Sequence, residues 1–126
     1  MNYDLIPTTL FTPLEYEFVR LSKEDVYKKY GKGKVTVIRK FFKPLEWNMF
    51  DQHEDDACYS KVKVCNDDDK VMGFHILCPH TGEIISGIAI AMNCGLTKSK
   101  LDSTGGIHPT IAEEVVTTDG EVKSGC

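Results

Sequence analysis

The sequence predicts an α+β domain in which helices pack on one side of an antiparallel β-sheet. Three observations support this prediction. The segments before Thr81 alternate or are rich in β-branched residues, as strands are, whereas helical periodicity prevails after it. The chain has 126 residues, a length that suits a single domain. Its composition, with 41% hydrophobic and 27% charged residues, is close to the average of globular proteins.

Turn and cap residues set the boundaries of the elements expected before Thr81. Pro13 is expected to bend the first strand or to place it at a sheet edge. Ser22 is a typical helix N-cap, and Gly31 is a typical residue for a helix end. The acidic run at 66–70 separates two apolar segments and predicts the turn of an antiparallel hairpin. The expected elements are an irregular start at 1–9, a strand at 10–21, a helix at 22–31, a strand at 35–42, a loop at 48–56 and hairpin strands at 58–65 and 71–77.

The C-terminal third of the chain is expected to be helical. Residues 83–92 are nearly all apolar, so this helix is expected to be buried against the sheet or against a second subunit. Thr97 is expected to cap a short helix. Proline is common in the first turn of a helix, so Pro109 predicts a last helix that runs to about Thr117, with His108 at its N-cap.

Charge and cysteine content narrow the class of function. The net charge is −4, and the lysines are interleaved with acidic residues, so we expect no nucleic-acid partner. No apolar run reaches the length of a membrane span, and the first residues lack the features of a signal peptide, so we expect no membrane contact. Five cysteines, an odd number, indicate reduced thiols. The expected location is the cytoplasm, with a mitochondrial form as the alternative.

A zinc site is the alternative use of these cysteines. It would combine Cys58 and Cys65 with His75, Cys78 and His80. The spacing lacks the close cysteine pair of most structural zinc sites, and Cys58 and Cys65 stand at opposite ends of one predicted strand. We therefore predict no metal site.

One segment near the C-terminus, from Gly106 to Glu114, holds the residues best suited to chemistry. His108 precedes a proline, and Glu113 follows about one helical turn later. A carboxylate at that position can reach back to the imidazole of His108 and fix its orientation. The residues alone leave two interpretations open: an acid/base pair, or a capping histidine beside an ordinary glutamate of a first helical turn.

The same segment resembles the C-terminal signature of the flavoprotein disulfide reductases, the family of glutathione reductase and thioredoxin reductase. That signature is His-Pro with a glutamate five positions after the histidine, as in His108, Pro109 and Glu113. Other segments extend the resemblance to about residues 5–118, and some of them are similar to animal thioredoxin reductases and thioredoxin-glutathione reductases in particular. The similar segments are 7–16 and 73–83 for the family, and 42–47, 94–98 and 101–104 for those reductases.

The resemblance implies that residues 1–118 form the dimerisation domain of such a reductase and residues 119–126 a short tail. His108 would act as the acid/base toward the redox thiols of the partner subunit, and Glu113 would orient it. The backbone of His108 and Pro109 would lie near the partner's FAD. The parent enzyme would be a homodimer that uses FAD and NADPH to reduce a disulfide of thioredoxin or glutathione.

Three residues depart from the family pattern. Cys78 stands where relatives usually have glycine, and Ser86 where they usually have glutamine. Gly105 replaces a β-branched residue, which is expected to loosen the loop that aims His108.

Cys126 ends the chain in Gly-Cys. Animal thioredoxin reductases end in Gly-Cys-selenocysteine-Gly, so Cys126 is interpreted as a remnant of such a redox tail. The alternative is an incidental terminal cysteine.

The chain has neither the glycine-rich dinucleotide motif nor the redox cysteine pair of this family, so the FAD and NADPH domains are expected to be absent from it. We therefore expect the isolated chain to hold no cofactor and to be inactive. The alternative is a stand-alone, non-enzymatic interaction or modulator domain, which would pair with itself or with a full-length reductase.

Overall fold

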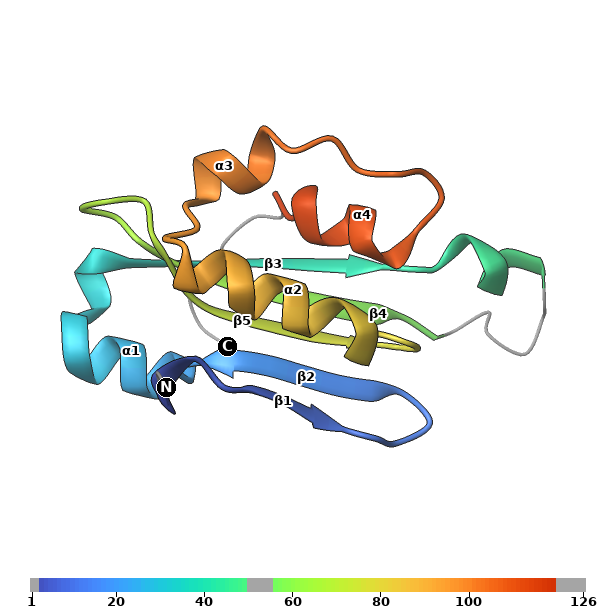
Figure 1. The fold of residues 1–126 in the computed structure, drawn as a ribbon, viewed down its shortest axis with the longest axis horizontal. Helices are drawn as coiled ribbons and strands as arrows, with labels where there is room; N and C mark the ends of the chain where they lie inside the picture. Colours follow the sequence, from blue (N-terminus) through green and yellow to red (C-terminus); the bar gives the residue numbers. More distant parts are fainter. Residues whose placement is uncertain (1–2, 50–55, 120–126) are drawn as a thin grey trace.

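Five strands form one antiparallel sheet in the order β1-β2-β5-β4-β3 (Figure 1). The computed structural model describes residues 3–49 and 56–119. The α+β prediction is confirmed. The strands are β1 (Pro7–Leu10), β2 (Glu15–Arg20), β3 (Val35–Phe42), β4 (Cys58–Cys65) and β5 (Val71–Cys78). The α-helices are α1 (Lys23–Tyr30), α2 (Gly82–Asn93), α3 (Lys98–Asp102) and α4 (Ile111–Val116), and the short 3-10 helices are η1 (Tyr3–Leu5), η2 (Lys32–Lys34) and η3 (Leu45–Met49).

The N-terminal region forms a hairpin of two strands, so the predictions of an irregular start through residue 9 and of one strand at 10–21 are wrong. The bend expected at Pro13 and an edge position for the first strand are confirmed. Pro7 pairs with Val19, and Leu10 pairs with Tyr16. Pro13 lies in the bend between β1 and β2. Because proline has no backbone N–H to donate to a ladder, it interrupts the pairing and the chain reverses direction there.

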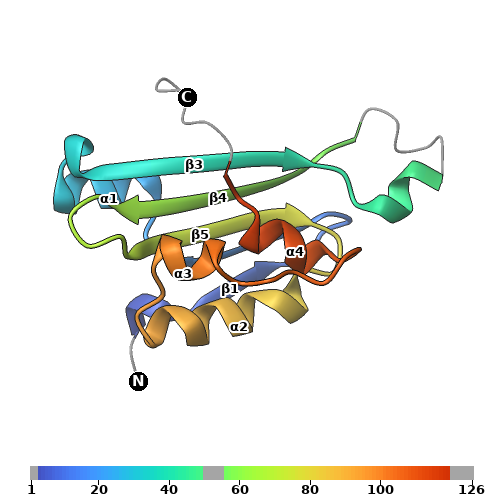
Figure 2. The ribbon, with the colours of Figure 1, turned by 90° about the horizontal axis from the view of Figure 1, so that it is seen from above.

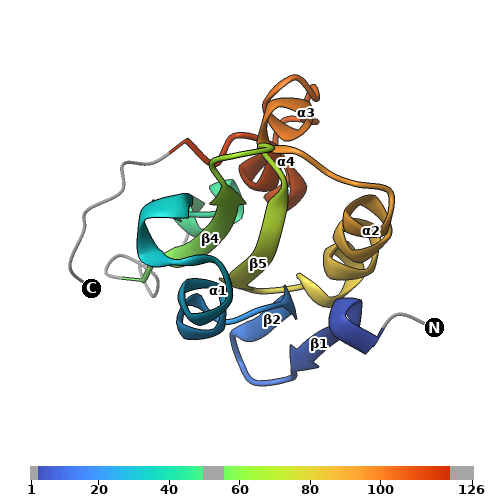
Figure 3. The same cartoon turned by 90° about the vertical axis from the view of Figure 1, so that its left-hand side faces the viewer.

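Helices cover both faces of the sheet (Figure 3). On one face, Ile85 of α2, Leu101 of α3 and Val115 of α4 belong to the larger core cluster, together with Phe74 of β5. On the other face, Val26 of α1 belongs to a smaller cluster, whose further members are Val35, Val37, Cys65 and Met72. Successive side chains of a strand point to opposite faces, which supplies apolar contacts to both layers. The predicted layer of helices on one side of the sheet therefore consists of α2, α3 and α4. The helix α1 forms a second layer on the opposite face.

Most of the predicted helix boundaries are confirmed by their caps. The Oγ atom of Ser22 accepts a hydrogen bond from the backbone N–H of Asp25 at 3.1 Å. Gly31 ends α1 with φ 87°, a conformation that glycine adopts without a steric penalty. The hydroxyl of Thr97 accepts from the backbone N–H of Lys100 at 3.2 Å and caps α3.

The helix α2 is amphipathic rather than apolar on all sides. Its buried residues are Ile85, Ala89 and Met92, whereas Ile90 is 66% exposed on the outer surface. Within residues 3–49 and 56–119, no helix is both long enough and apolar enough to cross a membrane.

Candidate functional site

His108 belongs to the loop between α3 and α4. This loop lies at the end of the sheet where β3 also ends (Figures 1 and 2). The side chain of His108 is 74% exposed. Ile107, the residue before it, is also exposed, and the peptide bond between His108 and Pro109 is cis. The loop thus presents an imidazole and an apolar side chain at the surface of the chain.

Glu113 holds the imidazole of His108. The Nδ1 atom of His108 lies 2.8 Å from the Oε2 atom of Glu113. An ionised carboxylate only accepts hydrogen bonds, so Nδ1 carries the proton and donates it, and Nε2 remains for an incoming group. Glu113 belongs to the first turn of α4 and is largely covered, with 25% of its side chain exposed. The structure therefore joins the two residues that the sequence analysis proposed as a pair.

The N-cap of the last helix is Thr110, so the prediction that His108 caps the helix is wrong. The Oγ1 atom of Thr110 accepts from the backbone N–H of Glu113 at 3.2 Å and donates to the backbone carbonyl of Ile107 at 2.7 Å. A threonine hydroxyl in extended backbone conformation fits this position well. Because Thr110 caps α4, the side chain of His108 is available to Glu113.

Gly106 allows the loop to lie directly against α4. A Cβ atom at Gly106 would lie 2.7 Å from the Cγ atom and 3.1 Å from the Cα atom of Glu113, closer than real side chains approach. A Cβ atom at Gly105 would meet nothing within 4 Å. Gly106, whose role the sequence analysis did not identify, therefore positions the loop, whereas Gly105 makes no comparable contact.

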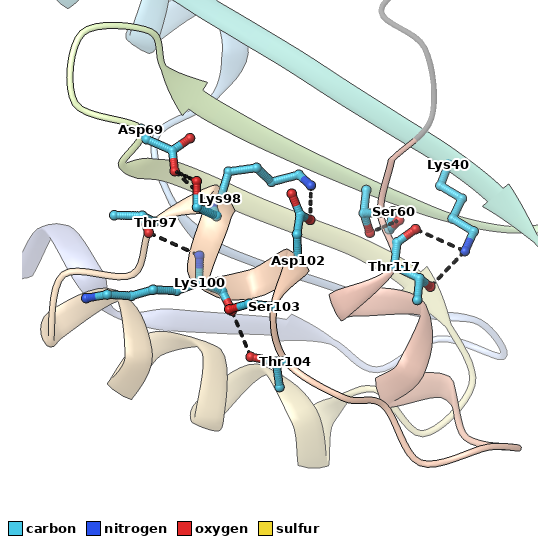
Figure 4. A network of polar contacts seen from close by, with 12 residues as sticks. Lys40, Ser60, Asp69, Thr97, Lys98, Lys100, Asp102, Ser103, Thr104 and Thr117 are labelled. Carbon is cyan, nitrogen blue, oxygen red and sulfur yellow. Dashed lines mark hydrogen bonds and ion pairs between the residues drawn. The ribbon is translucent and has the colours of Figure 1, made fainter.

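Contacts with β3 and β4 fix α4 on the sheet (Figure 4). The Nζ atom of Lys40 pairs with the Oε2 atom of Glu114 at 2.6 Å. It also donates to the hydroxyl of Thr117 at 2.9 Å. The hydroxyls of Ser60 and Thr118 lie 3.2 Å apart and are buried. These contacts hold α4, and with it Glu113, in a fixed position on the sheet. The orientation of the His108 imidazole therefore depends on the folded sheet.

A groove of about 600 Å³ lies beside His108. Its walls come from the start of α4 and from the segment after β3, where Leu45 and Met49 are exposed. His80, from the turn before α2, also lines it and has φ 58°. The sequence indicates no role for His80 beyond that of a candidate zinc ligand, because the turn and the groove meet only in the folded chain.

The residues considered for zinc are divided between the two faces of the sheet. Cys58 and Cys78 belong to the larger core cluster, and Cys65 belongs to the smaller cluster on the opposite face. His75 hydrogen-bonds through Nδ1 with the hydroxyl of Tyr16 at 2.7 Å. In the part of the chain that the structure describes, no three residues of the metal-binding types come together. Ser86 is exposed on α2, and Cys126 lies outside the described residues.

A buried polar cluster on the α1 side of the sheet was not predicted. Lys63 is fully buried, and its Nζ atom donates to the carbonyl of Leu21 at 2.7 Å and hydrogen-bonds with the Nε2 atom of His75. Burial lowers the pKa of Lys63 to about 7, and burial together with the charge of Lys63 lowers the pKa of His75 to about 3. A Cβ atom at Gly73 would lie 2.7 Å from the carbonyl oxygen of Leu21, so glycine leaves the room that this cluster needs. The alternation of residues 58–65 assigns the side chain of Lys63 to one face of the sheet. It does not show that other residues cover this face at Lys63, so the burial could not be predicted.

Two comparisons with known proteins show the family to which the chain belongs. Residues 6–118 match the family model described as the dimerisation domain of pyridine nucleotide-disulphide oxidoreductases. The chain is also similar to thioredoxin reductase SEP1 of Emiliania huxleyi, with 39% identity over 135 aligned residues. That alignment covers 100% of this chain but 27% of the relative, so the chain spans a little over a quarter of the relative's length.

Proposed function

Because the chain belongs to the pyridine nucleotide-disulphide oxidoreductases through their dimerisation domain, we propose that it holds two reductase subunits together and supplies His108 to the partner's dithiol. The parent enzyme in this proposal is an NADPH-dependent flavoprotein that reduces a disulfide. His108 is the acid/base, and Glu113 orients it.

The exposure of His108, whose imidazole is held by Glu113, is the observation that carries the proposal. A histidine that served thiols of its own domain would lie beside them in a cleft. His108 is instead 74% exposed, and among the described residues that line its groove there is no cysteine. A positioned imidazole whose substrate thiols come from another subunit has this arrangement.

The chemistry requires one proton transfer in each direction. The free Nε2 atom of His108 accepts the proton of a thiol of the partner subunit, which leaves a thiolate, the nucleophilic form of cysteine. The imidazolium stabilises that thiolate and later returns the proton to the departing thiol of the substrate disulfide. Glu113 keeps Nδ1 protonated and the ring oriented through both transfers.

FAD and NADPH belong to other parts of the parent enzyme in this proposal. When bound there, they supply the electrons that reduce the dithiol. The sequence of this chain offers no glycine-rich loop to hold a dinucleotide, so its residues do not form a cradle for either group. Only the exposed backbone of His108 and Pro109 would approach the partner's FAD, and no step of the proton transfer depends on that contact.

The relative named thioredoxin reductase favours thioredoxin as the disulfide substrate, with glutathione as the alternative. The net charge of −4 supports the absence of a nucleic-acid partner. An odd number of cysteines is consistent with a reducing compartment such as the cytoplasm, and a redox role for Cys126 remains part of the proposal.

A His108→Gln variant of the full-length reductase that contains this domain tests the proposal. We expect disulfide turnover to fall by roughly 10²- to 10⁴-fold, the usual contribution of a positioned acid/base, while flavin content and dimer mass stay the same. His80→Gln is the matched control, because His80 lines the same groove. Unchanged turnover in the His108 variant would contradict the proposal.

The isolated chain provides an independent test. We expect a colourless preparation without flavin absorbance and without NADPH-dependent disulfide reduction. A yellow, active preparation would overturn the assignment of cofactors and catalysis to the rest of the parent.

The exposed surface of α2 favours a second candidate function, that of a non-enzymatic interaction module. Ile90 is an exposed apolar side chain on a helix whose opposite face is buried. Such a module would pair with itself or with an intact reductase. Mixing the chain with an intact reductase tests this function, and unchanged activity without co-elution counts against it.

A further inference from the structure

Cys58 and Cys78 occupy facing positions at the open end of the β4–β5 hairpin. The register pairs Tyr59 of β4 with Leu77 of β5, and the next residues outward on the two strands are Cys58 and Cys78. Both side chains are fully buried in the larger core cluster, so they point to the same face of the sheet. The two thiols lie close enough for Cys58 to raise the pKa of Cys78.

This position satisfies the geometric requirements of a disulfide. Residues directly opposite on antiparallel strands have Cα atoms roughly 4.5–5.5 Å apart. Disulfides join Cα atoms that are about 4.4–6.8 Å apart. The irregularity in the β4–β5 register lies at Lys63 and Val64, away from the cysteines, and the pairing between it and the strand ends is regular. The separation expected for facing residues of the two strands is therefore within the range that a disulfide spans.

We propose that Cys58 and Cys78 are a redox modification site that forms a reversible cross-strand disulfide when a peroxide oxidises it. The sulfur of one of the two cysteines attacks a peroxide oxygen and becomes a sulfenic acid, and the hydroxide that leaves takes up the thiol proton as water. The thiol of the other cysteine then attacks the sulfenic sulfur, and a second water leaves. Two thiols thus lose two protons and two electrons, and hydrogen peroxide is reduced to two waters.

The surroundings of the pair limit its reactivity in the closed sheet. The neighbouring Cys58 thiol and burial raise the pKa of the Cys78 thiol, which disfavours its thiolate. Cys58 is the first residue of β4, and Cys78 is the last residue of β5. Strand ends open locally more readily than strand centres, which gives the oxidant its access.

The disulfide would restrain the end of the sheet next to the start of α2. The hydroxyl of Thr81, the residue before α2, donates to the backbone carbonyl of Cys78 at 3.0 Å. A bond between Cys58 and Cys78 would therefore tie β4 to the start of α2. Of the cysteines that the structure describes, Cys94 alone is exposed, so it is expected to react faster with peroxide. It lies at the end of α2 and is not part of the facing pair.

Peptide mapping of the 126-residue chain tests the site without any reductase activity. The chain is treated with hydrogen peroxide, unfolded in the presence of N-ethylmaleimide and digested without reduction. We expect a cross-linked peptide that contains Cys58 and Cys78, lighter than the sum of its parts by two hydrogen atoms and released by dithiothreitol. Cys65→Ala, a buried cysteine on the opposite face, is the matched control and keeps the cross-link, whereas Cys58→Ala loses it.

Mapping of the unsubstituted chain decides the question even where a variant fails to fold. Cys58 and Cys78 that both carry N-ethylmaleimide after peroxide treatment would overturn the proposal. So would linkage of either residue to another cysteine in place of the expected partner. None of these outcomes depends on the role of His108, so a failure here is distinct from a failure of the proposed function.

Discussion

The Nδ1 atom of His108 lies 2.8 Å from the Oε2 atom of Glu113, and this contact ties an exposed loop to a helix that is fixed on the sheet. Orientation of the imidazole is thus a property of the folded domain. It exists before a partner subunit or substrate arrives, so the domain carries a positioned acid/base rather than a mobile histidine.

Glu113→Gln should lower disulfide turnover in the full-length reductase by roughly 10- to 100-fold, as the loss of an orienting partner of a histidine typically does. The neutral amide still accepts a hydrogen bond from Nδ1 but no longer stabilises the imidazolium, so the pH dependence of kcat should change while KM does not. Glu114→Gln is the control, because that carboxylate pairs with Lys40 and does not contact His108. Equal effects of the two substitutions would show that Glu113 acts only through the stability of α4.

Gly106→Ala should destabilise the chain by about 1–3 kcal/mol, the usual cost of overpacking, because the new Cβ would lie 2.7 Å from Glu113 Cγ. It should also separate the side chains of Glu113 and His108, which a change in the imidazole NMR signals would report. Gly105→Ala is the matched control and should leave stability the same or raise it by about 0.4–1 kcal/mol, since its Cβ meets nothing. A stable Gly106 variant with unchanged imidazole signals would disprove the close approach.

The strands and helices with strong local signals were predicted well from the sequence. Alternation predicted the β4–β5 hairpin, and cap residues predicted α1 and α3 to within a residue or two. Local patterns do not separate β1 from β2, because Pro13 fits a bend within one strand as well as a turn between two strands. The position of α1 on the second face was also not predicted, because the residues that form its layer are distant in the sequence.

The site could be predicted only where its residues are close along the chain. The pairing of His108 and Glu113 follows from their spacing, and the structure confirms the contact. The N-cap was placed two residues too early, because Pro109 was assigned to the first helical turn and the hydroxyl of Thr110 was overlooked. The groove with His80 depends on contacts between segments more than twenty residues apart, for which local patterns give no signal.

Thr110→Ala should lower the free energy of unfolding by about 1 kcal/mol, the typical cost of losing an N-cap. The substitution removes the acceptor for the backbone N–H of Glu113 and the donor to the carbonyl of Ile107. Thr110→Ser keeps the hydroxyl and should retain most of the stability. Urea unfolding of both variants measures the difference, and equal losses would mean that the methyl group of Thr110, rather than its hydroxyl, stabilises the loop.

Lys63 should make the chain more stable as the pH rises from about 7 to 10.5. Burial lowers the pKa of Lys63 to about 7 from its ordinary value of 10.5. Between these values the unfolded chain binds more protons than the folded chain, so the free energy of unfolding rises with pH, by an amount on the order of a few kcal/mol. Lys63→Met should abolish this rise, whereas Lys100→Met, a control at an exposed position, should keep it. Urea unfolding at a series of pH values measures both, and parallel curves for the Lys63 variant and the unsubstituted chain would show that the buried amine stays charged.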